Sequence, residues 1–132
     1  MRGLVKDDVL FEDEWCKATE KTLEIKWFYF PIAKSLVIPF GEIKGVYYRE
    51  QKMKQDLCKV KGWGMSFSPC WWACDVRRSW HSTTDGLSFY NVVIDCGERL
   101  YKGFTVQLIT QFLSVLRKHL QPECIIKNDL PF

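Results

Sequence analysis

The sequence lacks the short motifs that mark the common catalytic and nucleotide-binding sites. It contains no Gly-x-Ser-x-Gly, no His-Glu-x-x-His, and no glycine-rich phosphate loop of the Gly-x-x-x-x-Gly-Lys or Gly-x-Gly-x-x-Gly kind. Histidine is scarce, with only His81 and His119, so few side chains are available as a general base. From these absences we predict a non-enzymatic protein that holds no cofactor.

A strong charge of one sign is also missing. The formal net charge is +3 over 132 residues, whereas nucleic-acid-binding domains usually carry a strongly basic face. We therefore predict that nucleic acid is not a partner of this protein.

Long apolar runs are absent as well. The opening of the chain has no apolar run of signal-peptide length, which predicts a cytoplasmic protein whose six cysteines are free thiols. The most apolar stretch, residues 23–40, contains three charged residues and two prolines. It therefore predicts a hairpin that turns near Pro31, and not a membrane span.

What the chain does contain is the length and composition of one globular domain. Of its 132 residues, 47% are hydrophobic and 15% are aromatic, a mixture that favours strands with large core side chains. We expect a single domain over 1–132, with its core over about 23–120, an acidic opening segment over 1–20 and a tail over 121–132. The oligomeric state is left open.

Alternation of apolar and polar residues, with β-branched and aromatic side chains, predicts seven short strands. They cover residues 22–30, 35–40, 42–49, 57–67, 70–77, 87–95 and 99–103. Pro39 has no backbone N–H to donate, so the second strand should lie at a sheet edge or end at that residue.

The apolar period changes to that of a helix between Val106 and Leu120. Thr105 is the expected N-cap, cations over 117–119 suit the last turn, and Pro122 ends the helix. The predicted fold class is therefore mainly β, a small barrel or sandwich in which the C-terminal helix covers an open end.

The stretch GWGMSFSPCWWACDVRRSW, residues 62–80, holds four of the six tryptophans and invites a metal-site interpretation through Cys70, Cys74, His81 and Asp85. In a strand, however, Cys70 and Cys74 lie about 13 Å apart and cannot share a zinc ion. We therefore predict two core strands and no metal, with a metalloprotein or enzyme built on these residues as the least favoured hypothesis.

Strand alternation places Trp71 on the face opposite Trp72, so one of the two is the better candidate for the surface. An exposed tryptophan is a typical anchor of a protein interface. Our leading hypothesis is a non-enzymatic interaction module that binds a protein or peptide, with an unpaired sheet edge as a place for an added strand. The candidate partner-binding residues are Trp71, Trp80, Arg77, Arg78 and Tyr48.

The alternative hypothesis is peripheral binding to an anionic phospholipid membrane. Four lysines flank the polar loop over residues 50–56, and basic clusters of this kind attract anionic head groups. The candidate lipid-binding residues are Lys52, Lys54, Lys59 and Lys61.

Several segments together resemble a known family. They are IPFGEIKGVYY (38–48), KGWGMSF (61–67), YNVVIDCGERLYKGFT (90–105) and LITQFLSVLRKHL (108–120). The pattern is similar to that of bacterial-type pleckstrin-homology-like domains over residues 23–120. The resemblance implies a bent, seven-stranded antiparallel sheet that is capped at one end by the C-terminal helix, a scaffold used mostly for protein contacts.

Overall fold

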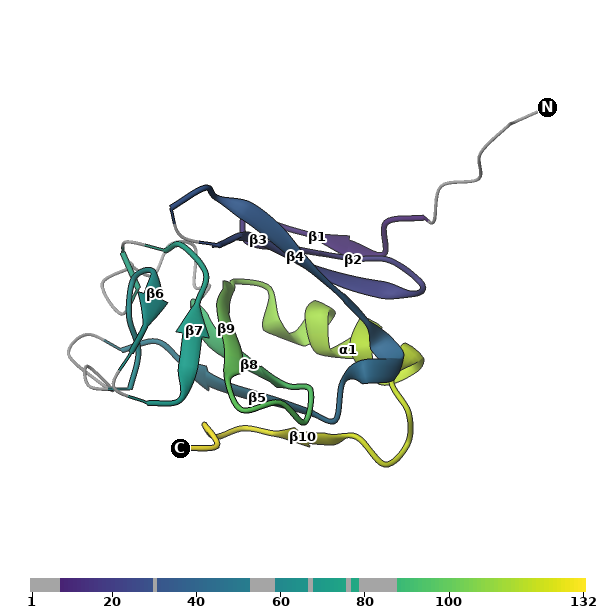
Figure 1. Ribbon diagram of the computed structural model, residues 1–132. Coiled ribbons are helices and arrows are strands. Elements are labelled where there is room, and N and C mark those ends of the chain that lie inside the picture. The colour runs from purple at the N-terminus through teal and green to yellow at the C-terminus, as the bar shows by residue number, and fades with distance from the viewer. Residues whose placement is uncertain (1–7, 30, 53–58, 67, 76, 79–87) are drawn as a thin grey trace.

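The computed structural model describes residues 8–29, 31–52, 59–66, 68–75, 77–78 and 88–132. Two β-sheets face each other, and one α-helix lies between them (Figure 1). The expectation of a mainly β protein with one helix near the C-terminus is therefore confirmed.

The first sheet is antiparallel and has four strands in chain order. They are β1 (Phe11–Glu12), β2 (Cys16–Ala18), β3 (Thr22–Tyr29) and β4 (Lys34–Pro39). The predicted hairpin joins β3 to β4, with its turn beginning at Pro31. Pro39 is the last residue of the edge strand β4, as expected of a residue without an N–H.

The second sheet has six strands in the order β10-β5-β8-β9-β7-β6. Two of its pairs are parallel, β10 with β5 and β7 with β9. The strands are β5 (Gly45–Glu50), β6 (Gly64–Met65), β7 (Cys70–Trp72), β8 (Tyr90–Asp95), β9 (Tyr101–Val106) and β10 (Ile125–Lys127).

The helix α1 (Ile109–His119) begins later than predicted. Thr105 is not its N-cap, because the chain continues as strand β9 through Val106, and its residues 103–106 are buried. The apolar stripe and the basic last turn are confirmed, since Phe112, Leu113 and Leu116 are buried and residues 117–119 are basic. A short 3-10 helix, η1 (Phe40–Glu42), leads from β4 toward β5.

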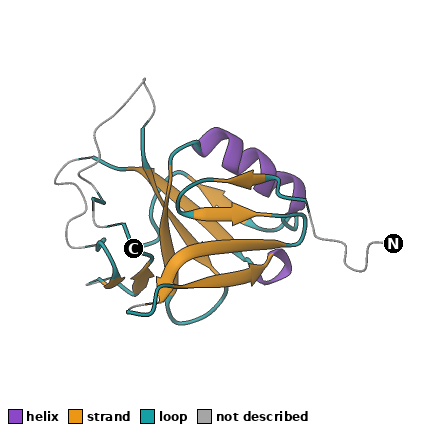
Figure 2. Ribbon diagram, turned by 90° about the horizontal axis from the view of Figure 1, so that it is seen from above, coloured by secondary structure: helices purple, strands orange, loops and turns teal. Residues whose placement is uncertain are grey.

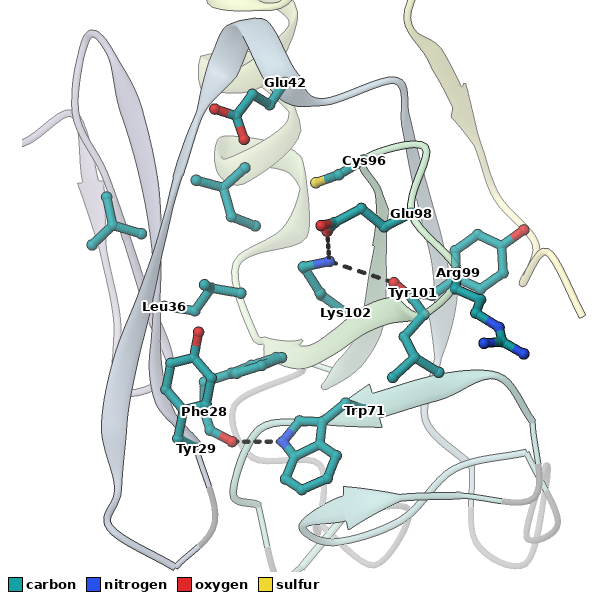
Figure 3. A pocket seen from close by; sticks show the side chains of 13 residues that line it. Phe28, Tyr29, Leu36, Glu42, Trp71, Cys96, Glu98, Arg99, Tyr101 and Lys102 are labelled. Carbon is teal, nitrogen blue, oxygen red and sulfur yellow. Dashed lines mark hydrogen bonds and ion pairs between the residues drawn. The ribbon is translucent and has the colours of Figure 1, made fainter.

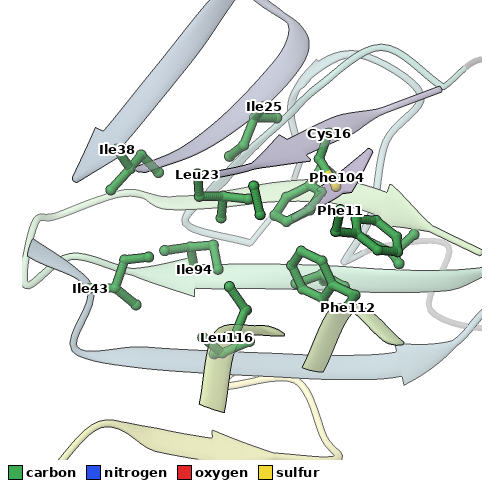
Figure 4. Packing of buried hydrophobic residues seen from close by; sticks show 14 of the residues in the cluster. Phe11, Cys16, Leu23, Ile25, Ile38, Ile43, Ile94, Phe104, Phe112 and Leu116 are labelled. Atoms are coloured by element: carbon green, nitrogen blue, oxygen red, sulfur yellow. The ribbon is translucent and has the colours of Figure 1, made fainter. Parts of the chain in front are cut away.

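One face of each sheet and the apolar stripe of α1 enclose the main core (Figure 4). Leu23 and Ile25 come from β3, Ile94 and Phe104 from the second sheet, and Phe112 from the helix. The rings of Phe104 and Phe112 meet edge-to-face at 5.9 Å between centroids. In Figure 2 the helix runs beside the short strands of the first sheet, where it covers one opening between the two sheets.

The expected barrel is not present in the described residues. The two sheets share no strand pairing there, so they pack face to face without closing. The strand count also exceeds the predicted seven, because both ends of the chain add strands. At the C-terminal end, β10 pairs with β5, and the ring of Phe132 lies 5.7 Å from that of Tyr101.

The predicted strands over 57–67 and 70–77 are shortened to β6 and β7. After Trp72 the backbone turns to distant partners, with Cys74 N donating to Trp27 O at 2.8 Å and Asp75 N to Gly62 O at 2.7 Å. These hydrogen bonds replace a regular ladder, so the stretch after β7 connects three parts of the chain instead of extending one sheet.

Candidate functional site

A groove of about 690 Å³ lies between strand β4 and the segment that leads into β9 (Figure 3). One wall comes from the first sheet and the other from the second. It is lined by Phe28, Tyr29, Leu36, Val37, Ile38, Glu42, Trp71, Cys96, Glu98, Arg99, Leu100, Tyr101 and Lys102. Its volume lies in the range typical of ligand pockets.

The β4 wall of the groove is a strand edge that has no neighbouring strand on its outer side among the described residues. Opposite residues of β3 and β4 include Leu23 with Ile38 and Glu24 with Val37, and Phe40 N donates to Lys21 O at 2.9 Å. In an antiparallel pair, residues that bond to the neighbouring strand alternate with residues that do not. Since Phe40 bonds to β3 through Lys21, every second residue before Phe40 bonds to β3 as well. The backbone groups of residues 36 and 38 therefore point to β3, and those of Ser35 and Val37 point outward.

The apolar end of the groove is fixed by two tryptophans. Trp71 Nε1 donates to Phe28 O at 2.8 Å, and Trp63 Nε1 donates to the same carbonyl at 3.3 Å. The pairing of β3 with β4 shifts register between Ile25 and Tyr29, and Trp27 has a positive φ of 57°. Positive φ is costly for a bulky residue, so the hydrogen bonds to this bulge hold it in place.

Exposed apolar side chains gather on the β3–β4 hairpin. Trp27 is 51% exposed, Tyr29 41%, Ile32 68% and Val37 53%. Exposed large apolar residues scattered singly are ordinary, but a group on one hairpin indicates a contact surface. Tyr29 and Val37 are among the residues that line the groove, although the Val37 side chain alternates to the outer face of β4. Trp27 lines a second hollow of about 500 Å³ on another side of the hairpin.

The other end of the groove is charged. Lys102 Nζ binds the Glu98 carboxylate, and this hydrogen bond and the charge of Lys102 lower the pKa of Glu98. The Glu42 carboxylate points into the same space (Figure 3). The half-buried Cys96 thiol lies between them, and burial is the main reason that its pKa is raised.

The side of β7 that carries Trp72, opposite to the groove, is buried. Trp72 lies against Gly103, where a Cβ atom would come within 2.3 Å of the indole ring. The Arg78 guanidinium lies 4.6 Å from the centre of the Trp72 ring. A glycine is therefore required at residue 103 for the indole to lie flat on β9.

Arg78 is 4% exposed, and its guanidinium is hydrogen-bonded on all sides. It donates to Lys61 O at 2.8 Å, to Ala73 O at 2.9 Å and to Asn91 Oδ1 at 2.7 Å. It also donates to the Thr105 hydroxyl at 2.9 Å. Burial lowers the pKa of Arg78 to about 10, and the charge of Asp75 opposes that shift, so the group stays cationic at neutral pH.

The structure separates the residues that the sequence predicted as one partner-binding set. Trp71 lines the groove, and Arg77 is exposed beside the second hollow. Tyr48 is half-buried against the core, with its ring 6.3 Å from that of Tyr90. Arg78 lies in the interior, which corrects its proposed place on the surface, and Trp80 lies outside the described residues.

The lysines of the membrane hypothesis border a segment that the structure does not describe. Lys52 and Lys61 are exposed, Lys59 is half-buried, and Lys54 lies outside the described residues. The carbonyls of residues 59 and 61 accept hydrogen bonds from Trp72 Nε1 and Arg78 Nε. The backbone at these two lysines is thus part of the buried network behind β7.

The residues that were weighed as a zinc set, and for which we predicted no metal, are only partly within the described residues. Cys70 is buried in β7 and Cys74 is half-buried beyond it, while residues 81 and 85 lie outside the description. The five described cysteines, residues 16, 70, 74, 96 and 124, are free thiols. Among the described residues, no group of three or more His, Cys, Asp or Glu side chains is placed to hold a metal ion.

No helix within the described part of the chain has the length and apolarity needed to cross a membrane. Comparisons of the chain with protein-family models, with curated proteins and with solved structures find no match.

Sequence reasoning identified one wall of this groove, through Trp71, and missed the other. The signals for β4 were present in the sequence, because Pro39 marks an edge and Val37 alternates with buried Ile38. The charged end was not predictable, because residues 42 and 98 are brought together by the packing of two sheets.

Proposed function

We propose that this protein is a binding module that takes an extended segment of a protein partner along the free edge of β4. The observation that carries the proposal is the edge of β4, which is unpaired within the described part of the chain and lies beside a groove with an apolar end. Addition of a strand to such an edge is a recurring mode of peptide recognition, in which main-chain hydrogen bonds supply affinity and side-chain pockets supply specificity.

Among the four outer strands of the two sheets, β4 is the best suited to accept a strand. β1 and β6 have two residues each and β10 has three, whereas β4 has six. Strand β1 is also next to the helix. An added strand is held by hydrogen bonds along the edge, and β4 is the longest of these four strands.

The groove supplies the apolar contacts that an edge alone lacks. Phe28, Leu36, Trp71 and Leu100 line it, and Trp71 is held in one orientation by its hydrogen bond to Phe28 O. Burial of one medium-sized apolar side chain of the partner contributes about 1.5–3 kcal/mol. Because the Trp71 indole is already held by a hydrogen bond before a partner binds, less of that gain is lost to ordering this side chain.

The resemblance of residues 23–120 to pleckstrin-homology-like domains is part of this proposal. It is supported by the mainly β architecture and by the helix that follows the last long strand. The parallel pairs β7–β9 and β10–β5 depart from the all-antiparallel sheet that the resemblance implies.

The test is a selection of random peptides displayed on phage against the folded protein, followed by titration of a selected synthetic peptide. We expect Val37→Pro to abolish binding, because proline removes the outward N–H of Val37 without touching the ladder to β3. Selection of no peptide, or of peptides that bind Val37→Pro as tightly as the wild type, would contradict the proposal.

A matched pair of side-chain variants controls for general loss of apolar surface. Val37 and Ile125 are each 53% exposed, on β4 and β10 respectively. Val37→Glu should weaken peptide binding about tenfold or more, the loss of about 1.4 kcal/mol, while Ile125→Glu should leave it unchanged. Equal losses in both variants would show that the peptide does not use the β4 edge.

Peripheral binding to anionic membrane remains the alternative proposal. It predicts salt-sensitive sedimentation with phosphatidylserine vesicles and loss of that binding when Lys52, Lys54, Lys59 and Lys61 are changed to glutamate. No sedimentation at low salt would rule it out, and the Val37 variants should have no effect on it.

A further inference from the structure

The free edge of β4 offers few hydrogen-bonding groups and is limited at its C-terminal end by Pro39. Ser35 and Val37 each present an outward N–H and C=O, while Pro39 presents only its C=O. A partner strand can thus exchange hydrogen bonds with two residues of β4. Beyond Val37 the proline supplies no donor, so the ladder ends there.

The pleat of β4 decides which side chains of the partner enter the groove. Leu36 and Ile38 point to the inner face, and Ser35, Val37 and Pro39 point to the outer face. Directly opposite residues of an antiparallel pair have side chains on the same face. The partner residues opposite Leu36 and Ile38 therefore enter the groove, and these two must be apolar.

The charged end of the groove determines which type of residue precedes the two apolar residues in the partner segment. Glu42 and Glu98 both face the groove there, and Lys102 is engaged by Glu98. Arg99 directs its guanidinium away from this space (Figure 3). Among the described residues Glu42 has no ion-pair partner, so one negative charge is left to face a ligand.

An antiparallel partner starts at this charged end, because β4 runs from the hairpin toward η1. Antiparallel pairing is the commoner arrangement and is slightly more stable per residue. We infer that the partner is a segment with a basic residue followed by two apolar residues at alternating positions. In chain order the segment reads basic, any, apolar, any, apolar. This inference rests on the proposed function, because it assumes strand addition to β4.

The test uses three fluorescein-labelled peptides, each flanked by Gly-Ser. The first is Lys-Thr-Val-Thr-Leu, the second replaces its lysine with glutamate, and the third is the reversed sequence Leu-Thr-Val-Thr-Lys. Binding to the wild type and to Glu42→Gln is measured by fluorescence polarisation. Glu42 is exposed, so this substitution leaves the fold intact, and circular dichroism checks that.

We expect the lysine peptide to bind the wild type about tenfold more tightly than the glutamate peptide, and this difference to shrink in Glu42→Gln. Equal binding of both peptides, with loss of both in Val37→Pro, would overturn the basic residue and leave strand addition standing. Tighter binding of the reversed peptide would overturn the antiparallel direction. Failure of all three peptides to bind, together with an empty phage selection, would overturn the proposed function as well.

Discussion

Trp71 and Trp72 are neighbours in β7, yet they belong to two regions with opposite properties. On the Trp72 side, the indole contacts Gly103 and Arg78, and the guanidinium of Arg78 makes four hydrogen bonds. On the Trp71 side, the indole lines an open groove beside the β4 edge, which pairs with no further strand in the part of the chain that the structure describes. The Arg78 network is hydrogen-bonded within the protein, whereas we propose that the groove region accepts one more strand.

The difference teaches that residue type alone does not assign a role. Arg77 and Arg78 are consecutive, but Arg77 is exposed and Arg78 is buried. Substitutions in the interior region should therefore cost more stability than substitutions in the groove region.

The largest effect is expected for Arg78→Met, which keeps much of the volume and removes the charge. Asp75, Asn91 and two backbone carbonyls would lose their shared partner inside the protein. Removal of one member of a buried charged network costs about 3–5 kcal/mol. Urea unfolding should show this loss, and a change below about 1 kcal/mol would contradict the importance of the network.

Gly103→Ala tests the contact beneath Trp72. The new methyl group would lie within 2.3 Å of the ring, and the ring cannot move away because Trp72 Nε1 donates to Lys59 O and to the Ser66 hydroxyl. Overpacking of this kind costs about 1–3 kcal/mol. Gly41→Ala is the control, since a Cβ there meets nothing within 4 Å. Equal melting temperatures for the two variants would contradict the close approach at Gly103.

Trp71→Phe separates stability from binding. It removes one hydrogen bond to Phe28 O, which still accepts from Trp63, so the cost in stability should be about 1 kcal/mol or less. Peptide affinity should fall by a larger factor, because the groove wall loses its fixed orientation. A variant that is strongly destabilised but binds normally would place Trp71 in the interior region instead.

The labelling rates of two cysteines distinguish the groove region from the interior region without any substitution. Cys96 lines the groove and is half-buried, whereas Cys70 is fully buried and its pKa is raised mainly by burial. Maleimide should therefore label Cys96 faster than Cys70 in the native protein, and bound peptide should slow the labelling of Cys96 alone. Mass spectrometry of the labelled peptides measures both rates, and protection of neither thiol by peptide would place the ligand elsewhere.

The sequence was sufficient for the elements with clear periodicity. Strands β3, β4, β5 and β8 lie close to their predicted ranges, and the helix stripe of Phe112 and Leu116 is confirmed. Alternation also separated Trp71 from Trp72 correctly. These features are local, because they depend on the spacing of side chains along one element.

The rest depended on contacts between distant segments. Thr105 resembles an N-cap in sequence, but its hydroxyl donates to Asp75 Oδ2 at 2.5 Å inside the sheet. Arginine is usually a surface residue, and the burial of Arg78 depends on its hydrogen bonds to Asn91 and Ala73, which the sequence does not predict. The parallel pairing of β7 with β9 likewise has no signal in the sequence of either strand.

The central claim is that a partner adds a strand to β4, and hydrogen exchange at the β4 amides tests it most directly. In the free protein the outward amides of Ser35 and Val37 should exchange rapidly, while those of Leu36 and Ile38, bonded to β3, should be protected. Saturating peptide should slow exchange at Ser35 and Val37 by about tenfold or more, and leave the β10 amides unchanged. If both amides still exchange rapidly in the peptide complex, the peptide does not pair with β4 and the account is wrong.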